Sequence, residues 1–280
     1  MDGDGDLDAV VGMGAGGLAY FENTGDALDP TFVQRTGGAN PFAGASVGAY
    51  AAPALADVDG DGDLDLLLGG ADGGVAYFEN TGDATAATYV ARSGGANPFD
   101  GFDVGQASLI AVTDFDGDGD ADLVAGERYG VLNYFENVGD RSAPSFVERL
   151  GVDNPFHGYD VGGYSAPTFA DINGDGNFDL VVGESTGELN YFRNVEAPTA
   201  PTTPKLALDA LGDTPFAGID VGMDSKPDFD DLDGTKAYLA GPPVMVETVT
   251  EKLKTLGVRR QDCHADAFYT EAEKSKLEGK

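Results

Sequence analysis

The hydrophobic positions of this chain fall into short runs, each bounded by glycine or by acidic residues. One such run, Leu66–Leu68, is preceded by acidic residues in DVDGDGDLD and is followed by Gly69 and Gly70. A run of this length between turn signals predicts a buried β-strand better than it predicts a helix. The segment YFEN, which follows each apolar run, predicts a further strand. The pattern therefore predicts β structure over most of the chain.

The pattern repeats with a constant period. The acidic run begins at positions 57, 114 and 171, which are 57 residues apart, and a first copy begins near residue 1. In the third unit one strand is expected to end at Asp114, and three more are expected at Asp122–Gly126, Gly130–Asn137 and Ser145–Leu150. Four short strands in a repeat of this length are typical of a β-propeller blade. The sequence therefore predicts an all-β fold, a β-propeller of about four four-stranded blades over residues 1–231.

Several motifs are interpreted as structure. The YFEN aromatics are expected in the blade core, because alternation puts one ring of each Tyr-Phe pair inward. NPF recurs at one place in the first three units, from Asn40, Asn97 and Asn154, and TPF follows at Thr214, three residues late in the fourth unit; this repetition favours a structural turn. Gly12–Gly17 matches the dinucleotide pattern GxGxxG and Gly183–Gly187 matches the nucleophile pattern GxSxG, but a predicted strand follows each where the chemistry needs a helix. No catalytic residue is predicted.

The acidic runs are the candidate chemistry. Five carboxylates within nine residues repel one another strongly unless a cation lies among them. Carboxylate and carbonyl oxygens at alternate positions of a short, glycine-rich loop suit Ca²⁺, which takes six to eight oxygen ligands in flexible geometry. An EF-hand is excluded because position 12 is Leu68, where that motif needs a bidentate glutamate, and because a strand follows the loop.

The candidate ligands occupy loop positions 1, 3, 5, 7 and 9, and position 7 is expected to bind through its backbone carbonyl. In the second unit these residues are Asp57, Asp59, Asp61, Asp63 and Asp65. The equivalent residues are Asp2, Asp4, Asp6 and Asp8 in the first unit, Asp114, Asp116, Asp118, Asp120 and Asp122 in the third, and Asp171, Asn173, Asp175, Asn177 and Asp179 in the fourth. The first unit has no position-1 ligand, and the fourth has an asparagine at position 3. We therefore expect the middle two loops to bind calcium most tightly.

Together these residues resemble a known family. The combination of DxDGDGxxD, an apolar strand and YFEN is similar to the FG-GAP/VCBS-type repeats of integrin-like propellers and of many bacterial surface and secreted proteins. The resemblance covers about residues 1–231. It implies a calcium-stabilised propeller that usually serves adhesion or recognition and sometimes carries a catalytic domain elsewhere. We expect a non-enzymatic module at the cell surface or outside the cell, with an unidentified protein or glycan as its ligand.

Composition limits the partners and the location. The chain has 16 Lys and Arg against 49 Asp and Glu, a formal net charge of −33. Such a surface repels nucleic acid and anionic membranes, so neither is expected as a partner. No apolar run of 18 residues exists, and the first residues read as part of a metal loop instead of a signal peptide. One Cys and two His supply soft-metal sites poorly.

The C-terminal residues 232–280 follow a different pattern. A strand at KAYLAG, an amphipathic helix and a strand near Cys263–Tyr269 predict a small βαβ appendage. The segment resembles the end of the NAD-binding domain of ferredoxin-reductase-like oxygenase reductases, whose C-G-P-P motif is matched at Ala240–Pro243 with Ala240 in place of the Cys. The flavin-binding R-x-Y-S motif and a cysteine cluster for an iron–sulfur centre are absent, so the segment cannot be a reductase alone. Because it also lacks the first strand and phosphate-binding turn of a dinucleotide site, we expect no NAD binding.

Three functions stay open at this point. The first is a non-enzymatic, calcium-dependent binding scaffold, and the second is an NAD-dependent oxidoreductase fragment or fusion suggested by the C-terminal segment. The third is a carbohydrate-binding propeller lectin, which the eleven Tyr would serve although the chain has no Trp.

Strand counting predicts how the propeller closes. The first unit holds only three strands, and a fifth opening strand is left over at Ser225–Asp231. We expect this strand to pair with the one that begins near Asp8, closing a four-bladed ring and leaving the protein monomeric. The alternative is an open arc from a larger propeller.

Overall fold

The computed structural model describes residues 3–26, 29–172 and 175–195 in full, and the backbone of three further strands at 206–208, 237–241 and 263–267. The first three strands are β1 (Ala9–Gly12), β2 (Leu18–Asn23) and β3 (Phe32–Arg35). The second and third units contain β4 (Ala52–Ala56), β5 (Asp65–Gly69), β6 (Val75–Asn80), β7 (Tyr89–Arg92), β8 (Leu109–Thr113), β9 (Asp122–Gly126), β10 (Leu132–Asn137) and β11 (Phe146–Arg149). The fourth contains β12 (Ala166–Ala170), β13 (Asp179–Gly183), β14 (Leu189–Asn194) and β15 (Leu206–Leu208).

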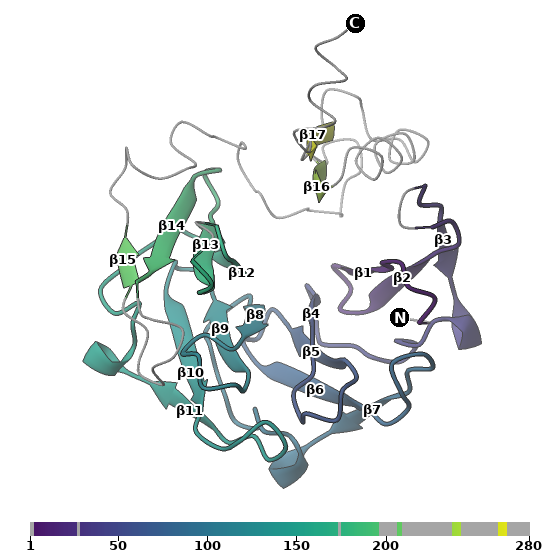
Figure 1. Cartoon of the computed structure of the whole chain (residues 1–280), viewed down its shortest axis with the longest axis horizontal. Coiled ribbons are helices and arrows are strands. Elements are labelled where there is room, and N and C mark those ends of the chain that lie inside the picture. The colour runs from purple at the N-terminus through teal and green to yellow at the C-terminus, as the bar shows by residue number, and fades with distance from the viewer. Residues whose placement is uncertain are drawn as a thin grey trace, which may run out of the picture.

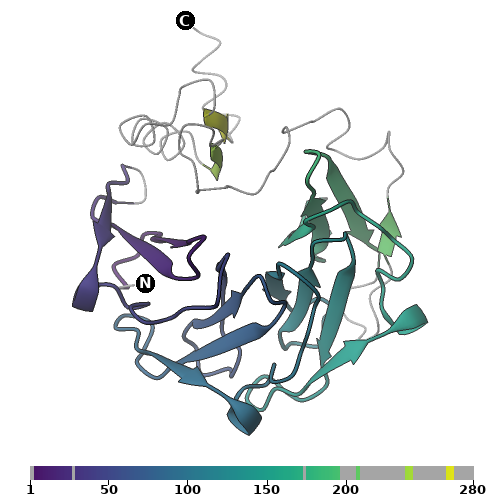
Figure 2. The ribbon, with the colours of Figure 1, turned by 180° about the vertical axis from the view of Figure 1, so that it is seen from behind.

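Each unit forms one antiparallel sheet whose strands are hydrogen-bonded in chain order, as predicted for a propeller blade. The second, third and fourth blades have four strands, in the orders β4-β5-β6-β7, β8-β9-β10-β11 and β12-β13-β14-β15, and the described part of the first blade has β1-β2-β3. The blades follow one another around an arc (Figures 1 and 2). On its inner side the opening strand β8 contacts the opening strands β4 and β12 of the blades on either side of it, and β3, β7 and β11 lie on the outer rim.

The hydrophobic core lies between the blades. Leu66, Leu67 and Leu68 of β5 are all fully buried. Leu66 and Leu68 pack against the first blade, around Tyr20, whereas Leu67 packs against the third, around Leu123. Successive side chains of a strand point to opposite faces, and both faces of this sheet are covered, so the strand is apolar at every position.

The same packing confirms that the YFEN aromatics belong to the core, and it buries both rings of the pair. In the second blade both Tyr77 and Phe78 are buried, with 3% and 8% of their surface exposed. One ring faces each neighbouring blade, so neither points to solvent. The structural interpretation of NPF is confirmed, because Phe99 is 1% exposed and its backbone N–H donates to the side-chain Oδ1 of Asn97 at 2.9 Å.

Part of the C-terminal prediction lies within the described residues. Strands β16 (Ala237–Gly241) and β17 (Cys263–Ala267) lie where the sequence predicted them and pair in parallel. A parallel pair requires a crossover connection, as in a βαβ unit. The predicted helix between them lies outside the described residues. The closing strand Ser225–Asp231 lies outside them too, so ring closure stays a prediction.

Candidate metal centres

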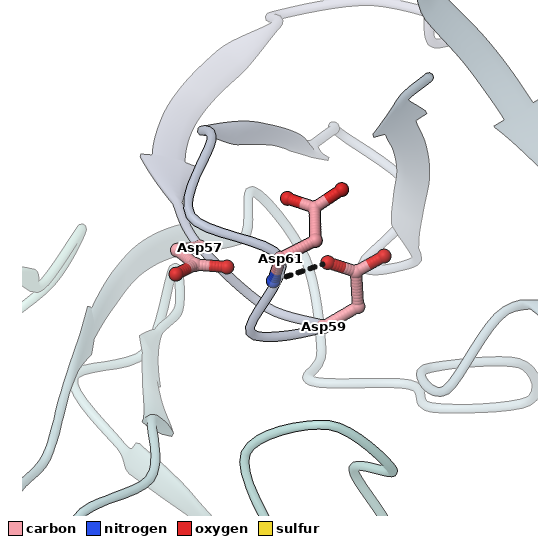
Figure 3. Close-up of side chains that lie close together, drawn as sticks. All are labelled: Asp57, Asp59 and Asp61. Carbon is pink, nitrogen blue, oxygen red and sulfur yellow. Dashed lines mark hydrogen bonds between the residues drawn. The ribbon is translucent and has the colours of Figure 1, made fainter. Parts of the chain in front are cut away.

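Each of the metal loops in the second and third blades brings three of its own carboxylates together. In the loop between β4 and β5, one oxygen from each of Asp57, Asp59 and Asp61 lies within 4.8 Å of the others. Figure 3 shows these side chains around the curl of the loop, where Asp61 N–H donates to Asp59 Oδ1 at 3.3 Å. The loop between β8 and β9 gathers three equivalent oxygens, from Asp114, Asp116 and Asp118. Positions 1, 3 and 5 therefore form a cluster in both loops, as the spacing predicted.

Local backbone hydrogen bonds fix this curl. Asp61 Oδ1 accepts from Asp63 N–H at 3.1 Å, so the carboxylates at positions 3 and 5 each bind the amide two residues further on. These turns are typical of aspartate, and Gly60 supplies the left-handed backbone between them with φ of 75°. Hydrogen bonds within the loop thus hold the carboxylates at positions 3 and 5.

Position 7 contributes a buried carboxylate that the sequence interpretation missed. Asp63 and Asp120 are each only 7% exposed, and the Oδ1 of each is buried without a hydrogen-bond partner. Asp57 Oδ1 is also buried and unpartnered. A buried carboxylate oxygen without a partner is costly, and a nearby cation would remove that cost. The sequence predicted only the carbonyl at this position, because burial of its side chain depends on packing.

Position 9 links the loop to the YFEN strand. Asp65 is 1% exposed, and its Oδ2 accepts from the Tyr77 hydroxyl at 2.8 Å and from Val58 N–H at 3.2 Å. Its Oδ1 accepts from Asn80 N–H at 2.8 Å. The same Tyr and Asn contacts recur at Asp8, Asp122 and Asp179. These carboxylates are not among the gathered oxygens, and their predicted role as ligands stays a prediction.

The sequence could have shown part of this link. Tyr77 lies 12 residues after Asp65 and Asn80 lies 15 residues after it, and these separations are the same in every unit. Such a constant spacing between a carboxylate and two hydrogen-bonding residues is a usable signal. The sequence interpretation of the Tyr ring covered only its packing in the core.

Burial and mutual repulsion raise the pKa of several loop carboxylates in the metal-free protein. Burial raises the pKa of Asp65 to about 6, and burial together with the charge of Asp118 raises the pKa of Asp116 to about 6 and that of Asp120 to about 7. Burial raises the pKa of Asp122 to about 8. Ionising these carboxylates in the folded protein therefore costs free energy, and a bound cation would offset that cost.

The first and fourth loops are described only in part. Asp2 and Asn173, the residues at position 3 of these two loops, lie outside the described residues. In the fourth loop Asp171 Oδ2 accepts from Gly176 N–H at 3.0 Å, which curls the loop around position 1. Among the described residues of these two loops, no three carboxylates gather as they do in the middle loops. The predicted ranking of the four loops is thus open.

The two other motifs adopt the turns that were predicted. Gly12–Gly17 connects β1 to β2, and Gly16 N–H donates to Met13 O at 2.8 Å within this turn. Ser185 lies in the connection between β13 and β14, where its N–H donates to Gly163 O at 2.8 Å. Because a strand follows each motif, neither has the helix that a phosphate site or a nucleophile elbow requires.

The donor set of the middle loops fits Ca²⁺. All gathered side-chain atoms are carboxylate oxygens, which are hard ligands, and the unpartnered oxygens of Asp57 and Asp63 lie in the same loop. Calcium accepts more oxygens and a less regular arrangement than magnesium does, whereas zinc prefers nitrogen and sulfur. The residues that would hold the ion are those of positions 1, 3 and 5, with position 7 beside them.

Comparison with known proteins agrees with the repeat pattern. Three overlapping stretches, residues 1–68, 57–125 and 114–182, match the family described as FG-GAP-like repeat. The matched stretches are offset by the 57-residue period of the sequence. They end before the C-terminal segment, so its resemblance to a reductase finds no support there. No curated protein sequence matches the chain.

A solved structure is also similar. It is that of an Agrocybe aegerita lectin, reported for its specific recognition of non-reducing terminal N-acetylglucosamine. The two chains are 22% identical, with a TM-score of 0.41, and the match covers 74% of this chain. It covers 50% of the lectin, so this chain spans about half the length of that protein. The described part of the chain contains no helix long and apolar enough to cross a membrane.

Proposed function

The chain belongs to the FG-GAP-like repeat family, and from this premise we propose that it is a calcium-stabilised β-propeller scaffold without enzymatic activity. We propose further that it acts in adhesion or recognition at the cell surface or outside the cell. Calcium binds the second and third loops most tightly and fixes the charge and shape of one end of each blade.

The observation that carries the proposal is the buried, unpartnered carboxylate beside each gathered triplet. Asp63 and Asp120 are both more than nine-tenths buried, and no donor in the described part of the chain satisfies their Oδ1 atoms. A solvated acidic turn would place these oxygens in water. The same arrangement in two blades is what a site built for a cation needs.

The test is calcium binding with a charge-matched control. Calorimetric titration of the wild-type chain should give saturable binding, and excess calcium should raise the melting temperature by about 5–10 °C, the effect of about 3 kcal/mol at 100 times Kd. Asp116→Asn with Asp118→Asn should abolish the site in the third loop. Asp100→Asn with Asp153→Asn, which removes two exposed charges elsewhere, should not. Equal melting curves in calcium and in a chelator would refute the proposal.

A specific surface favours glycan recognition as a second candidate function. Tyr129 is 66% exposed and Tyr164 is 37% exposed, and the Arg128 guanidinium lies over both rings, 5.9 and 5.8 Å from their centroids. Arg128 and Tyr129 follow the C-terminal end of β9, whereas the metal loop precedes its N-terminal end. The backbone of Tyr164 has φ of 57°, and the same left-handed conformation recurs one and two repeats earlier, at Ala107 and Tyr50, so it belongs to the repeated blade.

Exposed aromatic rings with a hydrogen-bonding neighbour are a suitable platform for a sugar or a peptide. A glycan array probed with the wild-type chain and with Tyr164→Ala tests this candidate. Loss of a saturable glycan signal in the variant supports it. An array without signal in calcium removes it and leaves a protein ligand for the scaffold.

A further inference from the structure

The second metal loop differs from the third in what its first carboxylate contacts. Asp114 accepts two backbone hydrogen bonds within its own loop, from Gly117 N–H at 2.9 Å and Gly119 N–H at 3.1 Å. Asp57, at the same position, instead has its Oδ2 2.6 Å from Nη2 of Arg141, 84 residues away. Its Oδ1 is buried without a partner. The position-1 carboxylate of this loop is therefore paired with a cation from another blade.

A fixed turn presents Arg141 to the loop. In the connection between β10 and β11, Asp140 Oδ1 accepts from Ser142 N–H at 2.9 Å and from Ala143 N–H at 3.0 Å. The second blade has the same turn, built on Asp83, and it has Ala84 at the place of Arg141. The turn thus forms with either residue, so its backbone does not require the arginine.

The loop and the turn lie in direct contact. A Cβ atom placed on Gly60 would lie 2.5 Å from the carbonyl oxygen of Arg141. The first loop has the same relation to the second blade, because a Cβ on Gly3 would meet Thr85. In each case a metal loop adjoins the turn of the next blade. Side chains on that turn can therefore act on the ion held by its neighbour.

We propose that Arg141 is an internal counter-cation of the second loop, which Ca²⁺ must displace from Asp57 in order to bind. The inference rests on the proposed function. A guanidinium at hydrogen-bond distance occupies a lone pair that the ion needs, and its positive charge repels the ion. The third loop, whose position-1 carboxylate is held by amides of its own loop, fills first, and the second fills at higher calcium.

The size of the effect follows from exposure. The Arg141 side chain is 62% exposed, so water and salt screen its charge, and it can swing away once calcium binds. A single screened charge near a divalent ion changes affinity by about three- to tenfold. The calcium affinity of the second loop should therefore be several-fold lower than that of the loop without the arginine.

The experiment is a calcium titration of the full chain followed by amide NMR, with Gly62 reporting the second loop and Gly119 the third. The variant Arg141→Ala gives the third blade the alanine that the second blade has at Ala84. It is compared with Arg193→Ala, an equal change of charge at an exposed residue of the fourth blade. We expect Arg141→Ala to lower the calcium midpoint of the second loop about fivefold and to leave the third loop unchanged.

The outcomes separate this inference from the proposed function. Binding at both loops with the same second-loop midpoint in Arg141→Ala and in wild type overturns the inference alone. An equal gain in Arg193→Ala overturns it as well, because the effect would then be one of net charge. If neither reporter shifts with calcium in any variant, the proposed calcium binding is refuted, and the proposed competition between Arg141 and calcium is refuted with it.

Discussion

Removal of calcium should make the stability of this protein fall steeply between pH 6 and pH 8. In the metal-free protein, burial raises the pKa of Asp122 to about 8, and burial with the charge of Asp118 raises the pKa of Asp120 to about 7. Unfolding returns both groups to water, where an aspartate has a pKa near 3.9. The folded state therefore binds protons in this window that the unfolded state does not.

The sign and size follow from this difference. A raised pKa gives stability that is complete below the unfolded pKa and is lost as the pH rises through the folded pKa. Near pH 7 Asp120 and Asp122 together hold about one proton or slightly more when folded and almost none when unfolded. The free energy of unfolding should thus fall by about 1–2 kcal/mol for each pH unit near neutrality.

The assay is urea unfolding at pH 6, 7 and 8, with a chelator and with saturating calcium. Calcium keeps the loop carboxylates ionised, so it should flatten the slope, and binding at pH 7 should release protons into a weakly buffered solution. The variant His157→Gln with His264→Gln should keep the slope, since neither histidine lies in a metal loop. Stability that is constant or rising with pH in the chelator would show that the buried carboxylates do not bind these protons.

Three further results are expected. Phe99→Ala should lower the free energy of unfolding by about 3–5 kcal/mol in a urea melt, because its ring is 1% exposed between blades. The control Val152→Ala, at a side chain that is 88% exposed, should change it by less than about 0.5 kcal/mol. Similar losses of stability in the two variants would contradict the core role of NPF. Gly60→Ala should lower the melting temperature more than Gly62→Ala does, since both glycines have positive φ but only Gly60 adjoins a neighbouring blade. A larger drop in melting temperature for Gly62→Ala would contradict the contact between the loop and the turn. Deleting all residues after Gly222 should expose strand edges and produce self-association in sedimentation, and a truncated chain that stays monomeric and equally stable would argue against ring closure.

The sequence by itself determined the repeat and the blade. The 57-residue period and the cluster at positions 1, 3 and 5 are found where the pattern placed them. So is the strand at Asp122–Gly126, and the strand predicted at Ser145–Leu150 is found at Phe146–Arg149. These features are local. A glycine-rich loop curls through hydrogen bonds between residues two apart, and an apolar run between turns has few alternatives to a strand.

Only the tertiary structure decided what lies beside each loop. Burial of the Asp63 side chain and the hydrogen bonds of Asp65 depend on how strands of one blade pack together. The YFEN aromatics are core residues as expected, but alternation accounts for only one ring of each pair. Tyr77 and Phe78 are both buried, because a second blade covers the face that an isolated sheet would leave in water. The pairing of Asp57 with Arg141 joins residues from different blades. A contact of that kind has no period in the sequence, since it follows from the rotation between neighbouring blades and from one side chain that the other units lack.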